Sequence, residues 1–424
     1  MTSFSQRSCL LAFAAALFAG PLAAPVPGQA LPSFAPGTPA YSVEATAAQG
    51  GVGTWLGGDA ANLLPLNSNP SQTVWTFGDC FIGVQGQTTR TTGGVFTFPI
   101  GSVLCTIANT NGTFTPTYFF RGTASNPTPF FPDPASPYIN GGSRFTPFQS
   151  FLINGKLFII MIRVLNNPNG RYAATVIARV SNPLAYPSQW IIDYLDLSNP
   201  NNGPPSATIE PQPALGGSSL HQDATGGGYL VIYGKFGEGP GTKTIAVKIA
   251  DSVLVNAPAG NVYSSVQALN SSLQWVNNYS SNIADYFDVN IPTGAPFTVR
   301  YNPGSGRWQA VFVATQNQVN SDGSQKWLPF MAAMDSTANG SPFGPWGPYK
   351  PIYYFPEMTP GNMLYDPSFF CYPGPSSELP AFSTNPNTNI VFNYLCNAPG
   401  TSTTVFTNMN IYYPKIVQVP NPLP

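Results

Sequence analysis

Short apolar runs bounded by turn-forming residues recur along the whole chain, and they most constrain its fold. Gly, Pro or Asn separates nearly all of these runs. The best candidate for a helix, Tyr263–Trp275, is short and polar. The runs contain the β-branched and aromatic residues typical of strands, and they cover Val74–Phe77, Leu157–Val164, Ala173–Val180, Tyr229–Tyr233, Thr244–Ile249, Thr298–Tyr301, Trp308–Ala314, Trp327–Ala333, Ile352–Tyr354 and Asn389–Tyr394. The sequence therefore predicts an all-β fold.

The length of the chain narrows the choice among all-β folds. Short strands at even spacing, without helices between them, are typical of a sandwich, a barrel or a propeller. A single sandwich or barrel is usually smaller than this 424-residue chain, which has no Pro/Ser-rich linker to divide it. We therefore favour a propeller and expect residues 31–424 to form one domain. No fixed repeat period gives the number of blades.

The N-terminus has the features of a secretory signal. Arg7 precedes an apolar run from Cys9 to Ala19, and Gly28–Ala30 offers small residues for cleavage. Residues 1–30 are therefore predicted to be a signal peptide, and the protein is predicted to be secreted and extracellular. No later stretch is long and apolar enough to suggest a membrane span.

Four cysteines remain once Cys9 leaves with the signal, and an even count in a secreted chain suggests two disulfides. Three connectivities are open, and the matched spacings favour Cys80–Cys105 and Cys371–Cys396.

Four sequons would be glycosylated in a eukaryotic host, and we take them as weak support for surface loops: Asn111, Asn270, Asn278 and Asn339.

The charge of the chain limits its partners. Only 8% of residues are charged and the net charge is -1, which argues against nucleic acid and anionic membranes, since both need a basic face. A neutral polysaccharide or glycoconjugate fits better, and we expect a monomer.

Two near-copies of one phrase, Trp55–Asp59 and Trp75–Asp79, end in aspartate. Turn residues at Asn67–Pro70 lie midway between them, so a hairpin would place Asp59 opposite Asp79. Retaining glycosidases use two carboxyl groups about 5–5.5 Å apart, one as nucleophile and one as acid/base. The pair therefore predicts a catalytic site, although Gly-Asp at a strand end is often only turn chemistry.

Counting removes several other reaction classes. His221 is the only histidine, which excludes two-histidine metalloprotease and three-histidine zinc sites. The sequence also lacks the Gly-x-Ser-x-Gly elbow and phosphate-binding glycine motifs. We expect no cofactor and no catalytic metal, and leave a structural calcium ion open.

Further candidates for substrate binding are His221 with Asp223, Asp366 as a third carboxylate, and Trp55 and Tyr365 as parts of an aromatic wall that stacks on sugars. Each has a structural alternative. A lone histidine most often packs or caps, Asp before Pro commonly starts a turn, and at least half of the tryptophans are expected in the core.

Several motifs together resemble a family of secreted five-bladed β-propellers, first defined as a domain of unknown function, that includes bacterial endo-D-arabinanases. The motifs are Trp55–Asp59, Val74–Gly83, Gly228–Gly234, Val299–Trp308 and Phe343–Trp346. The resemblance implies a five-bladed β-propeller, hydrolysis of furanoside-type sugars and a catalytic pair at Asp59 and Asp79. The chain departs from the family over Thr91–Pro99, where relatives carry polar residues, and this bears on substrate identity more than on chemistry.

Two functional classes remain. The first is a glycoside hydrolase acting on arabinan-like or galactan-like polysaccharide through a retaining mechanism. The second is a non-catalytic secreted propeller that binds glycans or protein partners. Convergence of both carboxyl groups at one site would favour the first class, and burial of either one against a cation would favour the second.

Overall fold

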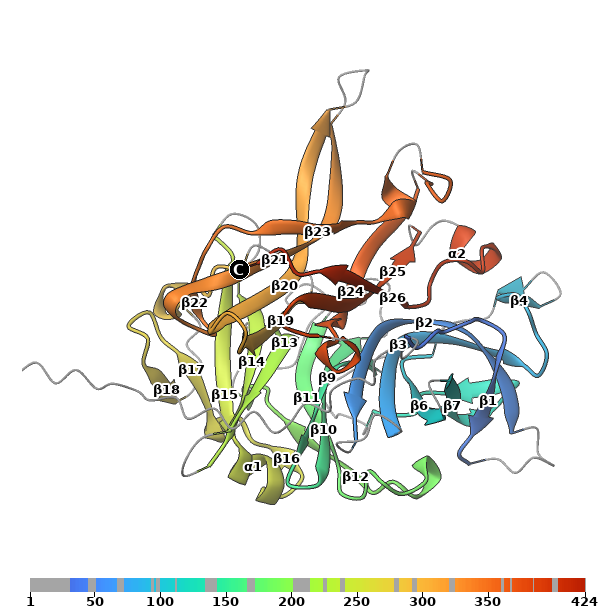
Figure 1. Cartoon of the computed structure of the whole chain (residues 1–424). Helices are drawn as coiled ribbons and strands as arrows, with labels where there is room; N and C mark the ends of the chain where they lie inside the picture. The colour runs from blue at the N-terminus through green and yellow to red at the C-terminus, as the bar shows by residue number, and fades with distance from the viewer. Residues whose placement is uncertain are drawn as a thin grey trace, which may run out of the picture.

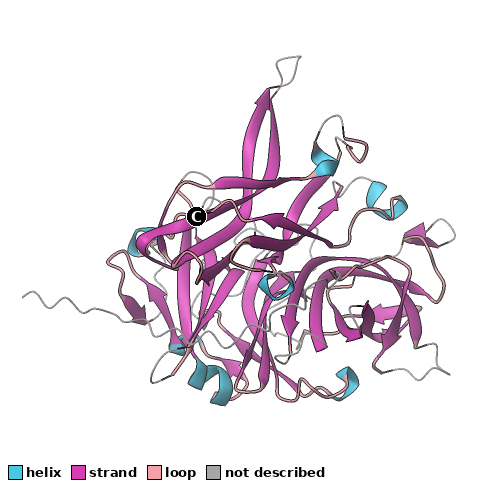
Figure 2. Cartoon of the chain, in the orientation of Figure 1, coloured by secondary structure: helices cyan, strands magenta, loops and turns pink. Residues whose placement is uncertain are grey.

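The computed structural model is almost entirely β-structure (Figure 2). It describes residues 31–44, 51–66, 72–92, 95–96, 100–110, 113–133, 143–165, 172–200, 214–223, 227–236, 241–277, 282–291, 296–319, 325–359, 362–366, 368–383, 385–398 and 403–423. The predicted signal peptide and the sequons at Asn111 and Asn278 lie outside these residues. Within them, no helix is long and apolar enough to cross a bilayer.

Five main sheets follow one another along the chain. The first contains β1 (Thr38–Ser42), β2 (Val52–Pro65), β3 (Gln72–Val84), β6 (Val103–Thr110), β7 (Thr113–Thr123) and β8 (Asn126–Thr128). The second contains β9 (Ser143–Ile153), β10 (Lys156–Leu165), β11 (Tyr172–Val180), β12 (Ile192–Asp196) and β16 (Gly260–Asn261). The third contains β13 (Ala214–Gln222), β14 (Tyr229–Phe236), β15 (Lys243–Ala250), β17 (Val266–Leu269) and β18 (Trp275–Asn277).

The fourth sheet contains β19 (Thr298–Asn302), β20 (Arg307–Val319), β21 (Gln325–Ser341), β22 (Gly344–Trp346) and β23 (Lys350–Tyr354). The fifth contains β24 (Phe370–Glu378), β25 (Asn389–Asn397) and β26 (Lys415–Pro420). A small ribbon pairs β4 (Thr91–Thr92) with β5 (Val95–Phe96). The helices are short: α1 (Asp251–Asn256), α2 (Thr404–Thr407), and 3-10 turns at Pro187–Gln189, Tyr263–Ser265, Ile283–Asp285, Pro356–Met358 and Pro380–Phe382.

The sheets are the blades of a five-bladed propeller, which confirms the predicted fold class. Their inner strands β2, β9, β13, β19 and β24 contact one another in a closed ring, and Figure 1 shows the sheets following in colour order around that ring. Polar side chains join the inner strands: Asn62 Nδ2 donates to Ser150 Oγ at 2.6 Å, and Ser219 Oγ donates to Gln149 Oε1 at 2.6 Å. The ring therefore encloses a polar axis.

Apolar side chains fill the spaces between neighbouring blades. The ring closes where Leu56 and Phe81 of the first sheet pack against Leu395 and Tyr412 of the last segment of the chain. All ten predicted strands lie within observed strands, and Tyr263–Trp275 is a 3-10 turn followed by β17 and the start of β18. The binary pattern of the sequence thus located the strands that form these interfaces.

The first blade curls into a small barrel. Strand β1 pairs antiparallel with β2 and parallel with β7, so the sheet closes on itself. Its interior is filled with aromatic rings, and Trp55 stacks on Tyr118 with ring centroids 4.4 Å apart. The prediction that Trp55 binds substrate is therefore wrong, because its side chain is fully buried in this barrel. Trp75 and Phe77 lie in the same core.

One of the two predicted disulfides is present. Cys371 and Cys396 are paired across β24 and β25 and are bonded. The predicted Cys80–Cys105 bond is wrong, because both residues are free and buried. The register explains this: Cys105 lies opposite Trp75, whereas Cys80 lies opposite Ile100. The two cysteines sit at different levels of the barrel, too far apart along the strands for the Cα separation of roughly 4.4–6.8 Å that a disulfide needs.

Candidate active site

The two aspartates lie next to each other on the β2–β3 hairpin, as the repeated phrase predicts. The register differs from the expectation by one position. Gly58 pairs with Cys80 and Asp59 pairs with Gly78, so β3 carries one extra residue at this point and Asp79 occupies a bulge. Bulges of this kind re-aim side chains and are frequent beside active sites. The hairpin therefore presents both carboxylates at one place without pairing them directly.

Two glycines before Asp59 make this geometry accessible. Gly57 has φ +136°, a conformation that side-chain-bearing residues rarely adopt. A Cβ on Gly58 would lie 2.4 Å from Cys80 Sγ, and the Gly58 N–H donates to the Tyr412 carbonyl at 2.9 Å. The Gly-Gly step thus lets β2 press against the neighbouring chain immediately before the carboxylate.

Asp79 is held by an arginine from the second blade. Arg144, at the start of β9, donates from Nε to Oδ1 at 2.8 Å and from Nη2 to Oδ2 at 3.2 Å. About a quarter of each side chain is exposed, 28% for Arg144 and 26% for Asp79. The two-point contact fixes the orientation of the carboxylate and offsets its charge, while water still reaches the pair.

Asp59 has a different partner, from the fifth blade. The hydroxyl of Tyr372 on β24 donates to Asp59 Oδ2 at 2.9 Å, and Asn397 Nδ2 lies 3.5 Å from the same hydroxyl. Burial raises the pKa of Tyr372 well above its usual value, and the nearby charge of Asp59 raises it further. The hydroxyl therefore stays protonated, and Tyr372 remains a hydrogen-bond donor to Asp59 over the neutral range.

The charges of Asp59 and Asp79 both reach the same two tyrosines. Burial is the main cause of the raised pKa of Tyr372 and of Tyr412, and the charges of both Asp59 and Asp79 raise it further. Two neighbouring carboxyl groups with unlike partners, one facing a guanidinium and one facing a phenol, can divide the roles of nucleophile and proton donor.

Not all of the other predicted site residues lie near Asp59 and Asp79. His221 lies toward the other end of the axis. Strand β9 shows this. Arg144 lies at the start of β9, whereas Gln149, which accepts a hydrogen bond from Ser219, lies in its middle. His221 comes two residues after Ser219, and its ring centroid is 6.4 Å from that of Phe151, near the end of β9. His221 and Asp223 are therefore not part of the Asp59 site.

At that end, His221 Nε2 is 3.0 Å and 3.1 Å from the two carboxylate oxygens of Asp251, and its Nδ1 is 3.9 Å from Asp223. These three side chains offer ligand atoms within 4.8 Å of one another and could hold a divalent cation. Glu357 with Cys371 and Cys396 forms a second such group, but its two sulfurs are bonded to each other.

Tyr365 and Asp366 precede β24, which carries Tyr372. Asp366 Oδ1 accepts hydrogen bonds from the backbone N–H and hydroxyl of Ser368 at 2.8 Å and 2.6 Å. That is the turn chemistry considered as the alternative for an aspartate before proline. Tyr365 is half-buried. Substrate binding by this pair stays a prediction.

Sequence reasoning missed Arg144 and Tyr372, which come from other blades than the aspartates. One signal was present for each: Arg144 is one of only 16 basic residues, and Tyr372 directly follows a disulfide cysteine. Neither signal says which carboxylate the residue will meet.

No known protein family and no curated protein matches the sequence. Among solved structures, the chain is similar to a putative hydrolase from Bacteroides ovatus, with a TM-score of 0.54 at 12% identity over 87% of this chain and 86% of that one. Weaker likenesses include an exo-beta-1,3-galactanase from Phanerochaete chrysosporium (0.43, 9% identity, 91% and 64% covered) and an arabinanase from Bacillus subtilis (0.38, 13% identity, 86% and 96% covered). At these identities the likeness to the Bacteroides protein concerns the fold.

Proposed function

We propose that the protein is a secreted retaining glycoside hydrolase that cleaves furanoside-type polysaccharide, arabinan-like or galactan-like. One observation carries the proposal: Asp59 and Asp79 lie side by side near one end of the propeller axis, each held by a partner from a different blade. A fold shared with a putative hydrolase supports it.

The two environments suggest which carboxyl group does what. Two hydrogen bonds from Arg144 fix the orientation of the Asp79 side chain, so Asp79 suits the nucleophile that attacks the anomeric carbon. Asp59 would donate a proton to the leaving glycosidic oxygen while its Oδ2 accepts from Tyr372. In the second step Asp59 would take a proton from water, whose oxygen attacks the anomeric carbon and releases Asp79.

The substrate class follows from charge and from the resemblance to the arabinanase-containing propeller family. A net charge of -1 with only 8% charged residues disfavours an acidic polymer, because such a ligand is best bound by a strongly basic surface. A neutral glycan of furanose units fits both features. The N-terminal signal and the Cys371–Cys396 bond support an extracellular site of action.

A second candidate is a non-catalytic glycan-binding propeller. The Asp79–Arg144 ion pair favours it, because a carboxylate already neutralised by a guanidinium resembles a structural contact. The partial exposure of both side chains favours the catalytic alternative, since an ion pair that water reaches contributes little to stability.

The test is incubation of the purified protein with arabinans, galactans and synthetic furanosides, with released reducing ends quantified. Proton NMR of the first product then gives the anomeric configuration. Retention supports the mechanism above, inversion contradicts it, and binding without turnover on the whole panel supports the second candidate.

A further inference from the structure

A bare aromatic ring stands beside the aspartate site. Phe370, the first residue of β24, is 41% exposed. Its ring stacks on that of Tyr372, with centroids 5.7 Å apart and planes 19° from parallel. Tyr372 in turn reaches Asp59 through its hydroxyl. Phe370 therefore stacks directly on the residue that contacts the proposed acid.

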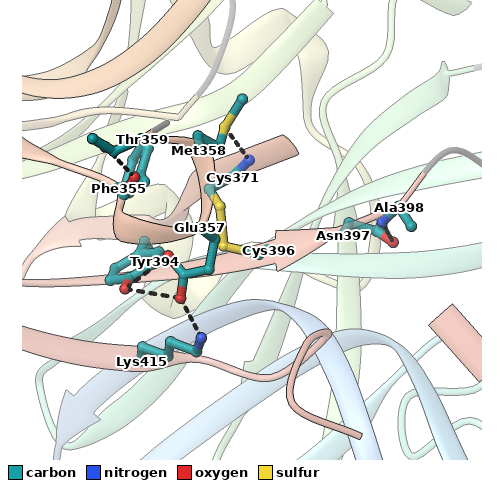
Figure 3. Close-up of a disulfide and its surroundings, with 10 residues drawn as sticks. All are labelled: Phe355, Glu357, Met358, Thr359, Cys371, Tyr394, Cys396, Asn397, Ala398 and Lys415. Atoms are coloured by element: carbon teal, nitrogen blue, oxygen red, sulfur yellow. Dashed lines mark hydrogen bonds and ion pairs between the residues drawn. A yellow bond between two sulfur atoms is a disulfide. The ribbon is translucent and has the colours of Figure 1, made fainter. Parts of the chain in front are cut away.

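The strand that carries these two rings is firmly anchored. Cys371 lies between them in sequence and is bonded to Cys396 on the neighbouring strand β25 (Figure 3). Both cysteines are buried, and the Cys371 N–H also contacts Met358 Sδ at 3.1 Å. Close by, Glu357 pairs with Lys415. Phe370 is thus presented to solvent from a rigid support, so little conformational entropy would be lost if a ligand covered it.

An exposed ring on a rigid support matches one kind of ligand well. The apolar face of a sugar ring lies flat on an aromatic side chain and leaves its hydroxyl groups free for polar partners. Phe370 packs against Tyr372 and still has 41% of its surface exposed, which is compatible with one stacked sugar ring. Charged ligands have less to gain there, because the aromatic pair offers no countercharge.

We propose that Phe370 is a sugar-binding subsite, on which a neutral monosaccharide unit stacks next to the unit held at Asp59 and Asp79. The inference rests on the proposed function, since it places the subsite within the same glycan chain. It adds a specificity-determining residue: substrates long enough to cover Phe370 would bind more tightly than those that end at the aspartates.

The test compares Phe370→Ala and Phe370→Trp with a control, Tyr186→Ala. Tyr186 is 57% exposed and lies in the connection between β11 and β12. This connection starts after Val180, which pairs with Leu157, and Leu157 in turn pairs with Leu152 near the end of β9. Tyr186 is therefore at the opposite end of the blade from Arg144, which lies at the start of β9. KM and kcat are measured on a series of oligosaccharides of increasing length from the best polysaccharide. Affinity for the longest one is also measured by calorimetry for each protein and in an Asp79→Asn background.

We expect Phe370→Ala to raise KM and Kd about tenfold for long substrates, to leave kcat within about twofold, and to have little effect on the shortest substrate. Phe370→Trp should restore affinity, and Tyr186→Ala should behave as wild type. Unchanged affinity in Phe370→Ala, alongside inactive aspartate variants, overturns the subsite and leaves the proposed function standing.

If the wild type binds the oligosaccharides without cleaving them, the hydrolase proposal fails. Loss of that binding in Phe370→Ala still supports the subsite in that case. If the wild type neither binds nor cleaves any glycan of the panel, both proposals are overturned.

Discussion

Replacing Arg144 by Met tests whether its ion pair with Asp79 serves stability or catalysis. Methionine retains an apolar stem that can pack over Gly101, where the Arg144 side chain lies, but it cannot hold Asp79. Because both partners are about a quarter exposed, water screens the pair, and its loss should reduce the free energy of unfolding by about 1 kcal/mol or less. For a chain of this size that corresponds to a change in Tm of about 2 °C or less.

The effect on activity should be far larger. Without the guanidinium, the Asp79 carboxylate loses the two hydrogen bonds that orient it, and misplacement of a nucleophile costs on the order of 10² in kcat. The assay is release of reducing ends from the best polysaccharide, with Tm measured by scanning calorimetry on the same preparations.

The chain offers a matched control in Arg121 of β7, which pairs with Glu44 at 2.7 Å and has a side chain that is 25% exposed. Arg121→Met should change Tm by a similar amount and leave kcat unchanged. If Arg144→Met hydrolyses substrate at the wild-type rate, Arg144 does not position a nucleophile and the reasoning is refuted.

The remaining predictions concern a hydroxyl, a buried acid and the cysteines. Tyr372→Phe should lower kcat roughly 10- to 100-fold and stability by about 0.5–1.5 kcal/mol, because Asp59 loses a donor; an unchanged kcat would contradict this. Burial raises the pKa of Glu378 above 4.5 against the opposing effect of its ion pair. Because the pKa of Glu378 is raised in the folded state, its contribution to the free energy of unfolding is fully present below pH 4.5 and is lost as pH rises through the folded-state pKa. In urea unfolding, the free energy of wild type minus that of Glu378→Gln should therefore decline from acid to neutral pH. An increase of this difference over the same range would contradict the prediction. Thiol titration of the chain without residues 1–30, and so without Cys9, should find two free thiols, which react only once the protein is denatured because both are buried with raised pKa values; four thiols or none would be inconsistent with the structure. Reduction of Cys371–Cys396 should cost about 3–4 kcal/mol.

The strands that the sequence revealed and those that it concealed differ in what they face. Strands such as β10 and β11 are buried on both sides and read as continuous apolar runs. The inner strands β9, β13 and β24 carry Ser, Gln, Gly and Pro, since one side of each faces the polar axis. Their composition resembles that of loops, so pattern alone did not mark them as strands.

The aspartate pair was predictable for a local reason, and its partners were not. Asp59 and Asp79 share one hairpin, whose turn residues and repeated phrase are visible in the sequence. Arg144 reaches the site because the second blade packs against the first, and Tyr372 reaches it because the fifth blade closes the ring against the first. The bulge at Asp79 likewise depends on close contacts of Gly58 with Cys80 and of its N–H with the Tyr412 carbonyl, which the sequence does not specify.

The same logic explains the errors over Trp55 and the barrel cysteines. From the sequence, an aromatic residue near a candidate carboxylate can equally be a sugar-binding surface or part of the core. In the structure β1 closes onto β7, and Trp55 is buried inside the barrel that results. Matched spacing of Cys80 and Cys105 suggested a bond, but the strand register places them at different levels.

The most direct test of catalysis by the aspartate pair is kcat of Asp59→Asn and Asp79→Asn on the best polysaccharide substrate, measured together with Tm. We predict that each substitution lowers kcat by several orders of magnitude while Tm stays nearly unchanged, and that the wild-type pH–rate profile is bell-shaped. Hydrolysis at a near wild-type rate by either variant would show that the substituted aspartate is structural and that the catalytic pair proposed here is wrong.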